Sequence, residues 1–220
     1  MLSTGLTAGD VQFMLLGAVV TLVLTFWAML GGTLLGLVFG VLRTVAPKWL
    51  DVPLGLILDV FRSIPLLIQL ILFNAAQAIF GLRMSNFTVS CIVLALYTSA
   101  YCSQIIHGGI IAVPLSLRRA GRSLGMTWWQ DMSLIVFPIS LRIMFPTWIG
   151  LTLGVLKDTA LVSWLGIIEL LKSSQIIVTR IQEPLLVLMT AGLIYFLLSF
   201  PVARLGGMLE RRWRENDRDF

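Results

Sequence analysis

The stretch RRAGRSLG, residues 118–125, followed by IVFP at residues 135–138, interrupts an otherwise apolar chain. Its three arginines lie within five residues, and long uncharged segments flank it. A chain this apolar has few reasons to keep such an insert. One reason is to present a basic docking surface to a partner on the cytoplasmic side of a membrane, where Lys and Arg accumulate. The insert therefore predicts a helical membrane protein with a basic cytoplasmic loop.

Composition indicates the same environment. Of the 220 residues, 58% are hydrophobic and 12% are charged, and the mean hydropathy is +0.94. A soluble protein of this composition would lack the polar surface needed to cover itself. The net charge of +5 lies beside apolar segments and not in an aromatic-rich patch, which favours charge asymmetry across a membrane over nucleic-acid binding. Cys91 and Cys102 lie about 16 Å apart along one predicted helix, too far for a disulfide bond.

Hydropathy predicts one domain, residues 1–220, built from five membrane-spanning helices. Each apolar run is long enough to cross about 30 Å of hydrocarbon. No basic segment precedes the first run, so we expect a retained span and not a cleaved signal peptide. The predicted spans cover about residues 11–42, 62–83, 86–112, 138–157 and 184–203, with the basic insert at about 114–137 and a charged tail at 204–220.

The distribution of basic residues predicts the orientation of the chain. Three segments are rich in Lys and Arg: the loop after the first span, the insert and the tail. With five spans all three fall on one side of the membrane, and basic loops stay in the cytoplasm. The prediction is an N-terminus outside and a C-terminus inside. The loop and tail cations are Arg43, Lys48, Arg204, Arg211, Arg212, Arg214 and Arg218.

Few residues indicate chemistry. The residues before the three lysines are Pro47, Leu156 and Leu171, so no glycine-lysine phosphate loop is present and the chain cannot drive transport with its own ATPase site. No His/Cys ligand spacing or nucleophile elbow occurs, and we expect neither metal nor cofactor in the chain. The row Gly32, Gly36 and Gly40 predicts close helix packing, either within the chain or at a subunit interface.

Four short stretches, in order, resemble the permease subunits of bacterial polar amino acid ABC importers, the histidine/glutamine/glutamate/arginine/opine permease group. That family's cytoplasmic signature is Glu-Ala-Ala, three residues, Gly, nine residues and Ile-x-Leu-Pro. Here Ala120, Gly125, Ile135 and Pro138 keep their places. The other three stretches are DVFRSIPLL at 59–67, AYCSQIIHGGI at 100–110 and KDTAL at 157–161, and the resemblance runs from about residue 17 to 212.

The resemblance implies a MetI-like, all-α permease core of five helices in the bacterial inner membrane. It also implies two cytoplasmic ATPase subunits that hold Mg-ATP, a periplasmic amino-acid-binding protein, and a second permease subunit that is either another copy or a sister chain. In this family the insert is a coupling helix that binds a groove of the ATPase. The residues that the resemblance places there are Arg118, Arg119, Ala120, Gly121, Arg122 and Gly125.

The chain departs from the family pattern at several positions. Arg119 replaces the signature Glu, and Gly121 replaces an Ala. Gln104 and His107 replace a Glu and an Arg that lie three residues apart, which suggests that one ion pair was replaced on both sides. Joint replacement favours a working subunit of a heterodimer. A degenerate subunit is the alternative.

An amino acid zwitterion needs an acidic partner for its ammonium group and donors for its carboxylate. Asp158 is the candidate for the first role, because it lies about 24 Å along its helix from Arg142, toward the outer half of the membrane. Alternatively, Asp158 pairs with Lys157 or caps the next helix. The candidates for the second role are Thr159, Tyr97, Thr98 and Tyr101.

Two other functional classes stay open. A secondary amino acid transporter would carry internal repeats of inverted topology, and the chain has no detectable self-similarity. A non-transporting membrane scaffold subunit is the other alternative.

Overall fold

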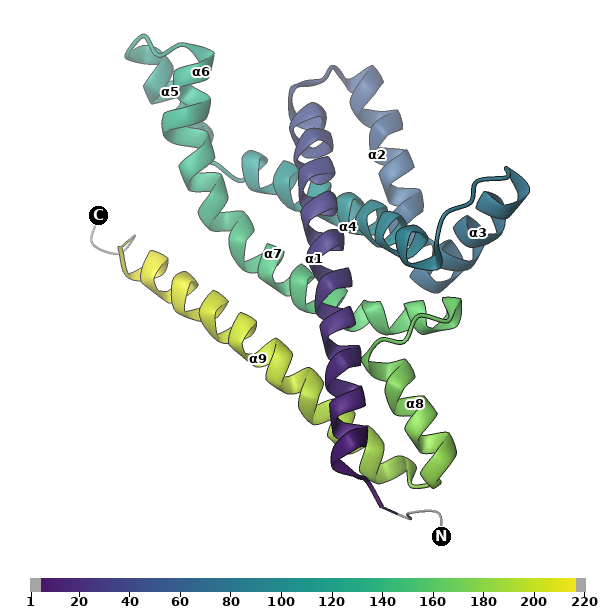
Figure 1. The fold of residues 1–220 in the computed structure, drawn as a ribbon. Coiled ribbons are helices and arrows are strands. Elements are labelled where there is room, and N and C mark those ends of the chain that lie inside the picture. Colours follow the sequence, from purple (N-terminus) through teal and green to yellow (C-terminus); the bar gives the residue numbers. More distant parts are fainter. Residues whose placement is uncertain (1–4, 217–220) are drawn as a thin grey trace.

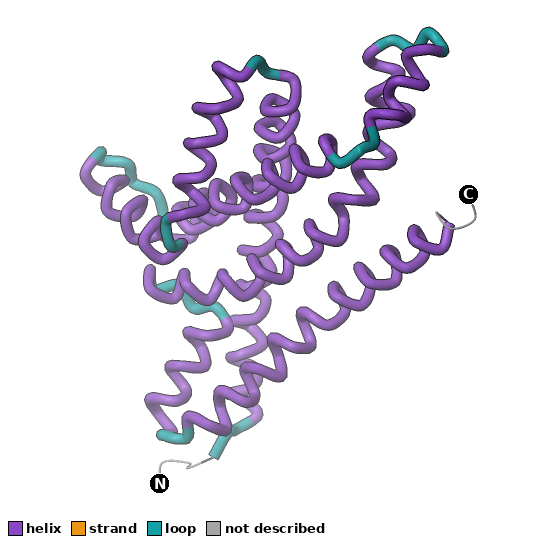
Figure 2. The backbone as a smooth tube through the Cα atoms, turned by 180° about the vertical axis from the view of Figure 1, so that it is seen from behind, coloured by secondary structure: helices purple, strands orange, loops and turns teal. Residues whose placement is uncertain are grey.

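In the computed structural model the chain is almost entirely helical over residues 5–216, the part that the structure describes, and no strand occurs in that range (Figure 1). Figure 2 shows that short loops join most of the helices. The first four residues and residues 217–220, the end of the predicted charged tail, lie outside the described range. The elements are α1 (Ala8–Val45), α2 (Lys48–Ser63), α3 (Leu66–Ile79), α4 (Asn86–Ile111), α5 (Leu115–Ser123), α6 (Trp128–Gln130), the π-helical η1 (Asp131–Val136), α7 (Phe137–Asp158), the 3₁₀-helical η2 (Thr159–Leu165), α8 (Leu170–Ile181) and α9 (Pro184–Asn216).

Four of the five predicted spans are confirmed as helices long and apolar enough to cross a bilayer. They are α1, α4, the continuous run Trp128–Leu165 that contains α7, and Pro184–Trp213 of α9. Helix α9 continues past the predicted end at residue 203, so the charged tail starts as an extension of the last span.

The predicted second span, residues 62–83, contains only the 14-residue helix α3, and the prediction left out the helix α2 that precedes it. Helices α2 and α3 are bent by 102° at a short break, and only together do they pass as a span. Pro65 explains the break, because it lacks a backbone N–H and forces Ile64 into an extended conformation (φ −83°, ψ 129°). The Gln69 amide donates to the carbonyls of Phe61 and Ile64 at 2.7 and 2.8 Å, which satisfies backbone oxygens left free by the bend.

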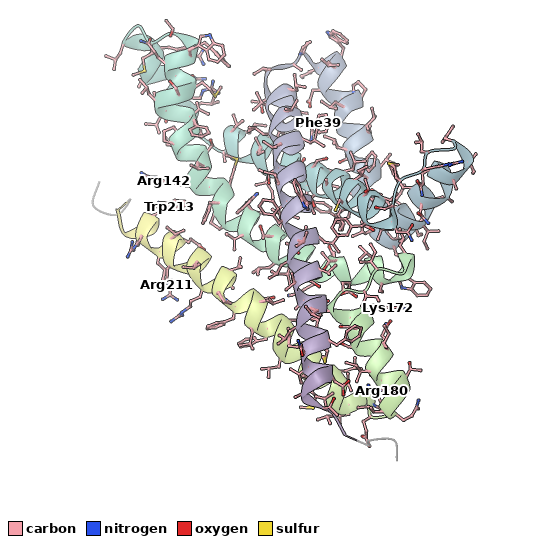
Figure 3. The ribbon with its side chains drawn as sticks, in the orientation of Figure 1. Phe39, Arg142, Lys172, Arg180, Arg211 and Trp213 are labelled. Atoms are coloured by element: carbon pink, nitrogen blue, oxygen red, sulfur yellow. The ribbon has the colours of Figure 1, made fainter. Side chains whose placement is uncertain are left out.

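Polar caps set where α1 begins. Thr7 and Asp10 form a capping box, in which the Asp10 amide donates to Thr7 Oγ1 and the Thr7 amide donates to the Asp10 carboxylate. Asp10 is buried and also pairs with Arg180 of α8. Figure 3 places Arg180 beside the N-terminal end of α1. The first turn of α1 is therefore fastened to α8.

The glycine row of α1 packs within the chain. A Cβ atom at Gly32 would lie 2.5 Å from Thr98, and one at Gly36 would lie 2.3 Å from the Cβ of Cys102, both on α4. Gly40 meets Ile106 in the same way at 2.8 Å. Small residues let two membrane helices approach closely. Of the two predicted uses of this row, the structure supports packing within the chain.

The molecule has two distinct ends, and the outer surface of its spans is apolar. The N-terminal end of α1 and helix α8 lie at the end opposite the projecting tip formed by α5 and α6 (Figure 1). Helices α7 and α9 contact each other, and Phe145 and Trp213 meet between them with ring centroids 5.0 Å apart. Many large apolar side chains are exposed on the spans, for example Leu16, Phe26 and Leu197. An exposed apolar surface of this extent fits a bilayer.

Candidate functional site

The structure brings three of the predicted substrate residues into one neighbourhood. Tyr97 and Tyr101 stand one turn apart on α4, with ring centroids 4.9 Å and hydroxyl oxygens 3.5 Å apart. Asp158, the last residue of α7, lies close enough to Tyr97 and Lys157 to interact with both electrostatically. Its side chain is partly buried and makes no capping hydrogen bond to η2. Within residues 5–216 the carboxylate is therefore not used as a helix cap.

Thr98 and Thr159 point elsewhere. Thr98 lies about 100° around α4 from Tyr97, so its side chain packs against Gly32 of α1 and is fully buried. The Thr159 hydroxyl donates to the carbonyl of Leu156 at 2.7 Å, and the residue is also fully buried. The two threonines take part in helix packing, whereas the two tyrosines and Asp158 are only partly buried.

Arg62 lies beside this candidate site, although it was not among the predicted site residues. It stands in the last turn of α2, pairs with Asp59, and its carbonyl oxygen lies 3.5 Å from the Tyr101 hydroxyl. Its Nε is buried and has no hydrogen-bond partner among the described residues. A cation at a proline-broken span was the available signal, because charged residues at membrane depth are costly and tend to be functional.

The basic insert folds into the projecting tip. Arg119, Ala120 and Arg122 are exposed on α5, whereas Gly121 faces inward. A Cβ atom at Gly121 would lie 2.8 Å from Ile135 of η1, so the family's Ala would not fit here without a shift. Gly125 lies in the turn between α5 and α6 with φ +81°, a left-handed conformation that glycine adopts readily. Exposed apolar side chains surround the two exposed arginines, among them Leu117, Leu124, Trp128 and Trp129.

Arg118 does not share the exposure of the other two arginines. Its Nε donates to Asp131 Oδ2 at 3.1 Å, and Asp131 is 2% exposed. The three cations therefore do not form one outward face. Sequence reasoning missed Asp131, because thirteen residues separate it from Arg118 and only the closed hairpin brings them together.

Gln104 and His107, which stand where the family has a Glu and an Arg, do not contact each other as a pair but meet separate partners on α1. Gln104 accepts a hydrogen bond at 3.1 Å from Arg43 of α1, which also pairs with Asp51 of α2 at 3.0 Å. His107 Nδ1 lies 3.1 Å from the hydroxyl of Thr44, also on α1. Both side chains tie α4 to the end of α1, so the two departures from the family pattern have separate partners.

A buried carboxylate joins α1, α8 and α9. Glu169 is fully buried at the start of α8, where it accepts hydrogen bonds from the amides of Leu171 and Lys172 at 2.8 and 2.7 Å. The Tyr195 hydroxyl of α9 donates to it at 3.2 Å, and Thr21 of α1 is a further partner. Burial raises the pKa of Glu169, and the backbone amides oppose that shift. Sequence reasoning missed this residue.

Among residues 5–216, no group of three or more His, Cys, Asp and Glu side chains is placed to hold a metal ion.

Comparison with known proteins extends over most of the chain. Residues 32–215 match the sequence profile of the binding-protein-dependent transport system inner membrane components. The glutamate/aspartate import permease protein GltK of Escherichia coli O6:H1 is 31% identical over 214 residues, which cover 92% of this chain and 94% of GltK. The glutamine transport system permease protein GlnP of Escherichia coli K12 is 27% identical, with 90% and 91% covered.

Solved structures of ABC transporters also superpose on most of this chain. A crystal structure of an amino acid ABC transporter with histidines superposes with a TM-score of 0.85 at 30% identity, covering 91% of this chain and 94% of that one. The methionine ABC transporter MetNI, in an inward-facing conformation, superposes with a TM-score of 0.81 at 20% identity over 94% of this chain and 99% of its own, which shows a shared fold. The chain belongs to the family of binding-protein-dependent transport system inner membrane components.

Proposed function

We propose that this membrane subunit imports polar amino acids, or opine-like amino acid derivatives, in an ATP-driven ABC importer. The observation that carries the proposal is a partly buried carboxylate, Asp158, which lies within the candidate span Trp128–Leu165, interacts electrostatically with Tyr97 and makes no capping hydrogen bond. Ionisable side chains inside a membrane are costly and are kept mainly where substrates or ions pass. The names of the relatives support the substrate class, because GltK and GlnP are described as glutamate/aspartate and glutamine permeases.

In this proposal each charged end of the substrate meets its own partner. Asp158 accepts hydrogen bonds from the ammonium group, and the hydroxyls of Tyr97 and Tyr101 donate to the carboxylate. Arg62, whose backbone carbonyl oxygen lies 3.5 Å from the Tyr101 hydroxyl at the α2–α3 bend, is a cationic residue close to this pair of tyrosines. Substrate binding alone does not drive import, because a cycle requires contacts that differ in strength between the outward-open and inward-open states.

The partners follow from the same proposal. Cytoplasmic ATPase subunits hold Mg-ATP and bind the α5–α6 tip through Arg119, Ala120, Arg122 and the exposed apolar residues around them. A periplasmic amino-acid-binding protein delivers substrate at the opposite end, and a second permease subunit, either another copy or a sister chain, completes the membrane part. This chain itself needs no cofactor.

We place the N-terminus in the periplasm and the C-terminus in the cytoplasm of the bacterial inner membrane. The α1–α2 turn, the α5–α6 tip and the end of α9 carry most of the exposed cations, and five spans put these segments on one side. Basic segments of this kind are retained in the cytoplasm.

Uptake into proteoliposomes that contain the assembled transporter tests the proposal. Asp158→Asn is expected to lower ATP-dependent uptake of amino acids while the complex still assembles, because the amide keeps the shape but loses the charge. Glu183→Gln, an exposed carboxylate-to-amide change in the α8–α9 loop, is the matched control. Unchanged uptake in Asp158→Asn, or failure to assemble, would support a structural role instead.

The same vesicles separate the remaining classes. Uptake that needs ATP and the ATPase subunits supports the importer. Uptake driven by an ion gradient without them would indicate a secondary transporter, and no uptake under either condition would indicate a scaffold.

A further inference from the structure

The α5–α6 tip is fastened to η1 by a buried ion pair. Arg118 Nε donates to Asp131 Oδ2 at 3.1 Å, with 3% of the Asp131 side chain and 19% of the Arg118 side chain exposed. A buried carboxylate is costly unless it has a partner, so each residue constrains the position of the other. Within residues 5–216 the second oxygen of Asp131 is buried and unpartnered, which leaves Arg118 as the group that neutralises it.

The face of α5 that carries Arg118 also packs against η1 at Gly121. Residues 118 and 121 are three apart and share that face, and Gly121 seats directly on Ile135 of η1. Arg119 and Arg122 occupy the adjacent, exposed face. The fold thus divides the three arginines, with one used to hold the hairpin and two left for a partner.

The hairpin formed by α5, α6 and η1 continues into α7, the helix that carries Asp158. Asp131 is the first residue of η1, and η1 runs without a break into α7, which ends at Asp158. Val136 is fully buried and packs with Ile106 and Ile110 at the end of α4. A displacement of α5 reaches α7 only if α5 and η1 move together.

We propose that Asp131 is a positioning residue for the transport cycle. Through Arg118 it holds α5 on η1, so that a push on the tip is transmitted along α7 toward Asp158. The nature of the pushing partner, an ATPase, rests on the proposed function. Without the ion pair, α5 pivots between Pro114 and Gly125 at its two ends, and the displacement is absorbed within the hairpin.

Asp131→Asn tests this proposal in the assembled transporter, because it keeps the shape of the side chain and removes its charge. Two quantities are measured: the number of substrate molecules imported per ATP hydrolysed, and the distribution of distances between spin labels at Ser123 and Thr147, in a background with Cys91→Ser and Cys102→Ser. We expect import per ATP to fall by about two- to thirtyfold and the distance distribution to broaden. The amount of ATPase that copurifies should stay unchanged.

Two further variants make the test specific. The charge swap Arg118→Asp with Asp131→Arg should restore both the narrow distribution and part of the lost import. Arg204→Gln, which removes an exposed cation from α9, should change neither quantity. A narrow distribution and normal import per ATP in Asp131→Asn would overturn the proposal.

If Asp131→Asn does not fold, Arg118→Gln decides the question. It removes the cation that pairs with Asp131 but keeps a polar side chain that can still hydrogen-bond to it. Wild-type values for both quantities in this variant would overturn the proposal. Absence of ATP-dependent import in the wild type would instead refute the proposed function, and the distance distribution would still report whether Asp131 holds the hairpin.

Discussion

Replacing Gly36 by alanine is expected to force α1 away from α4. The new Cβ would lie 2.3 Å from the Cβ of Cys102 and 3.0 Å from both the amide nitrogen of Ser103 and the carbonyl oxygen of Ser99. Two of these three atoms belong to the backbone and the third is fixed to it, so no side-chain rotation relieves the overlap. The two helices must separate or the α4 backbone must shift.

The magnitude follows from two opposing contributions. Gly to Ala in a helix interior favours folding by about 0.5–1 kcal/mol, whereas overpacking a close contact costs about 1–3 kcal/mol. Because rigid atoms make the contact, the cost lies near the upper end of that range, and the net loss in free energy of unfolding is about 1.5–2.5 kcal/mol. For a chain of this size, this loss lowers the melting temperature by about 3–10 °C.

Thermal unfolding of the detergent-purified protein, followed by tryptophan fluorescence, measures this difference. Gly192→Ala on α9 is the matched control, because nothing lies within 4 Å of its added Cβ, and its melting temperature should not fall. Adding Cys102→Gly to Gly36→Ala removes the nearest clashing atom and should recover part of the loss. Equal melting temperatures for Gly36→Ala and the wild type would refute the role of the glycine row in helix packing.

Three further predictions concern a buried carboxylate, an exposed arginine and the orientation of the chain in the membrane. Because burial raises the pKa of Glu169 above its ordinary value of 4.5, its contribution to stability is fully present below pH 4.5 and is lost as the pH rises through the folded-state pKa. Glu169→Gln should therefore remove that part of the pH dependence of the melting temperature, and a profile parallel to that of the Glu183→Gln control would contradict this. Arg119→Glu should reduce coupled ATPase activity if the ATPase groove is acidic, with partial rescue by a basic change in that groove. The ATPase activity should stay the same or rise if this subunit docks weakly and a sister permease does most of the coupling. A homodimer that couples at full rate with either Arg or Glu at position 119 would exclude both explanations. Single cysteines at Ser3 and Asp217, which lie outside the described residues, should react with an impermeant reagent from opposite sides of the membrane in a background without Cys91 and Cys102. Labelling of both from one side would exclude an odd number of spans.

The sequence by itself determined that the chain lies in a membrane, where most of its spans run, and where the basic insert interrupts them. An uncharged run such as residues 11–42 has few stable environments other than a bilayer, and its length sets the length of the helix. The break at Pro65 was not predicted, although proline removes a donor and restricts the residue before it. The angle of the bend was not readable, since it depends on how α3 packs against α4 and η2.

Only the tertiary structure decided which partners the polar residues meet. Helical spacing places Tyr97 and Tyr101 on one face, yet it does not say that α1 covers the neighbouring face, which buries Thr98 against Gly32. Similarly, Arg118 resembles Arg119 and Arg122 in sequence, but closure of the hairpin turns it toward Asp131. Periodicity determines which residues share a face, whereas the partner of that face comes from chain segments that meet only when the helices pack.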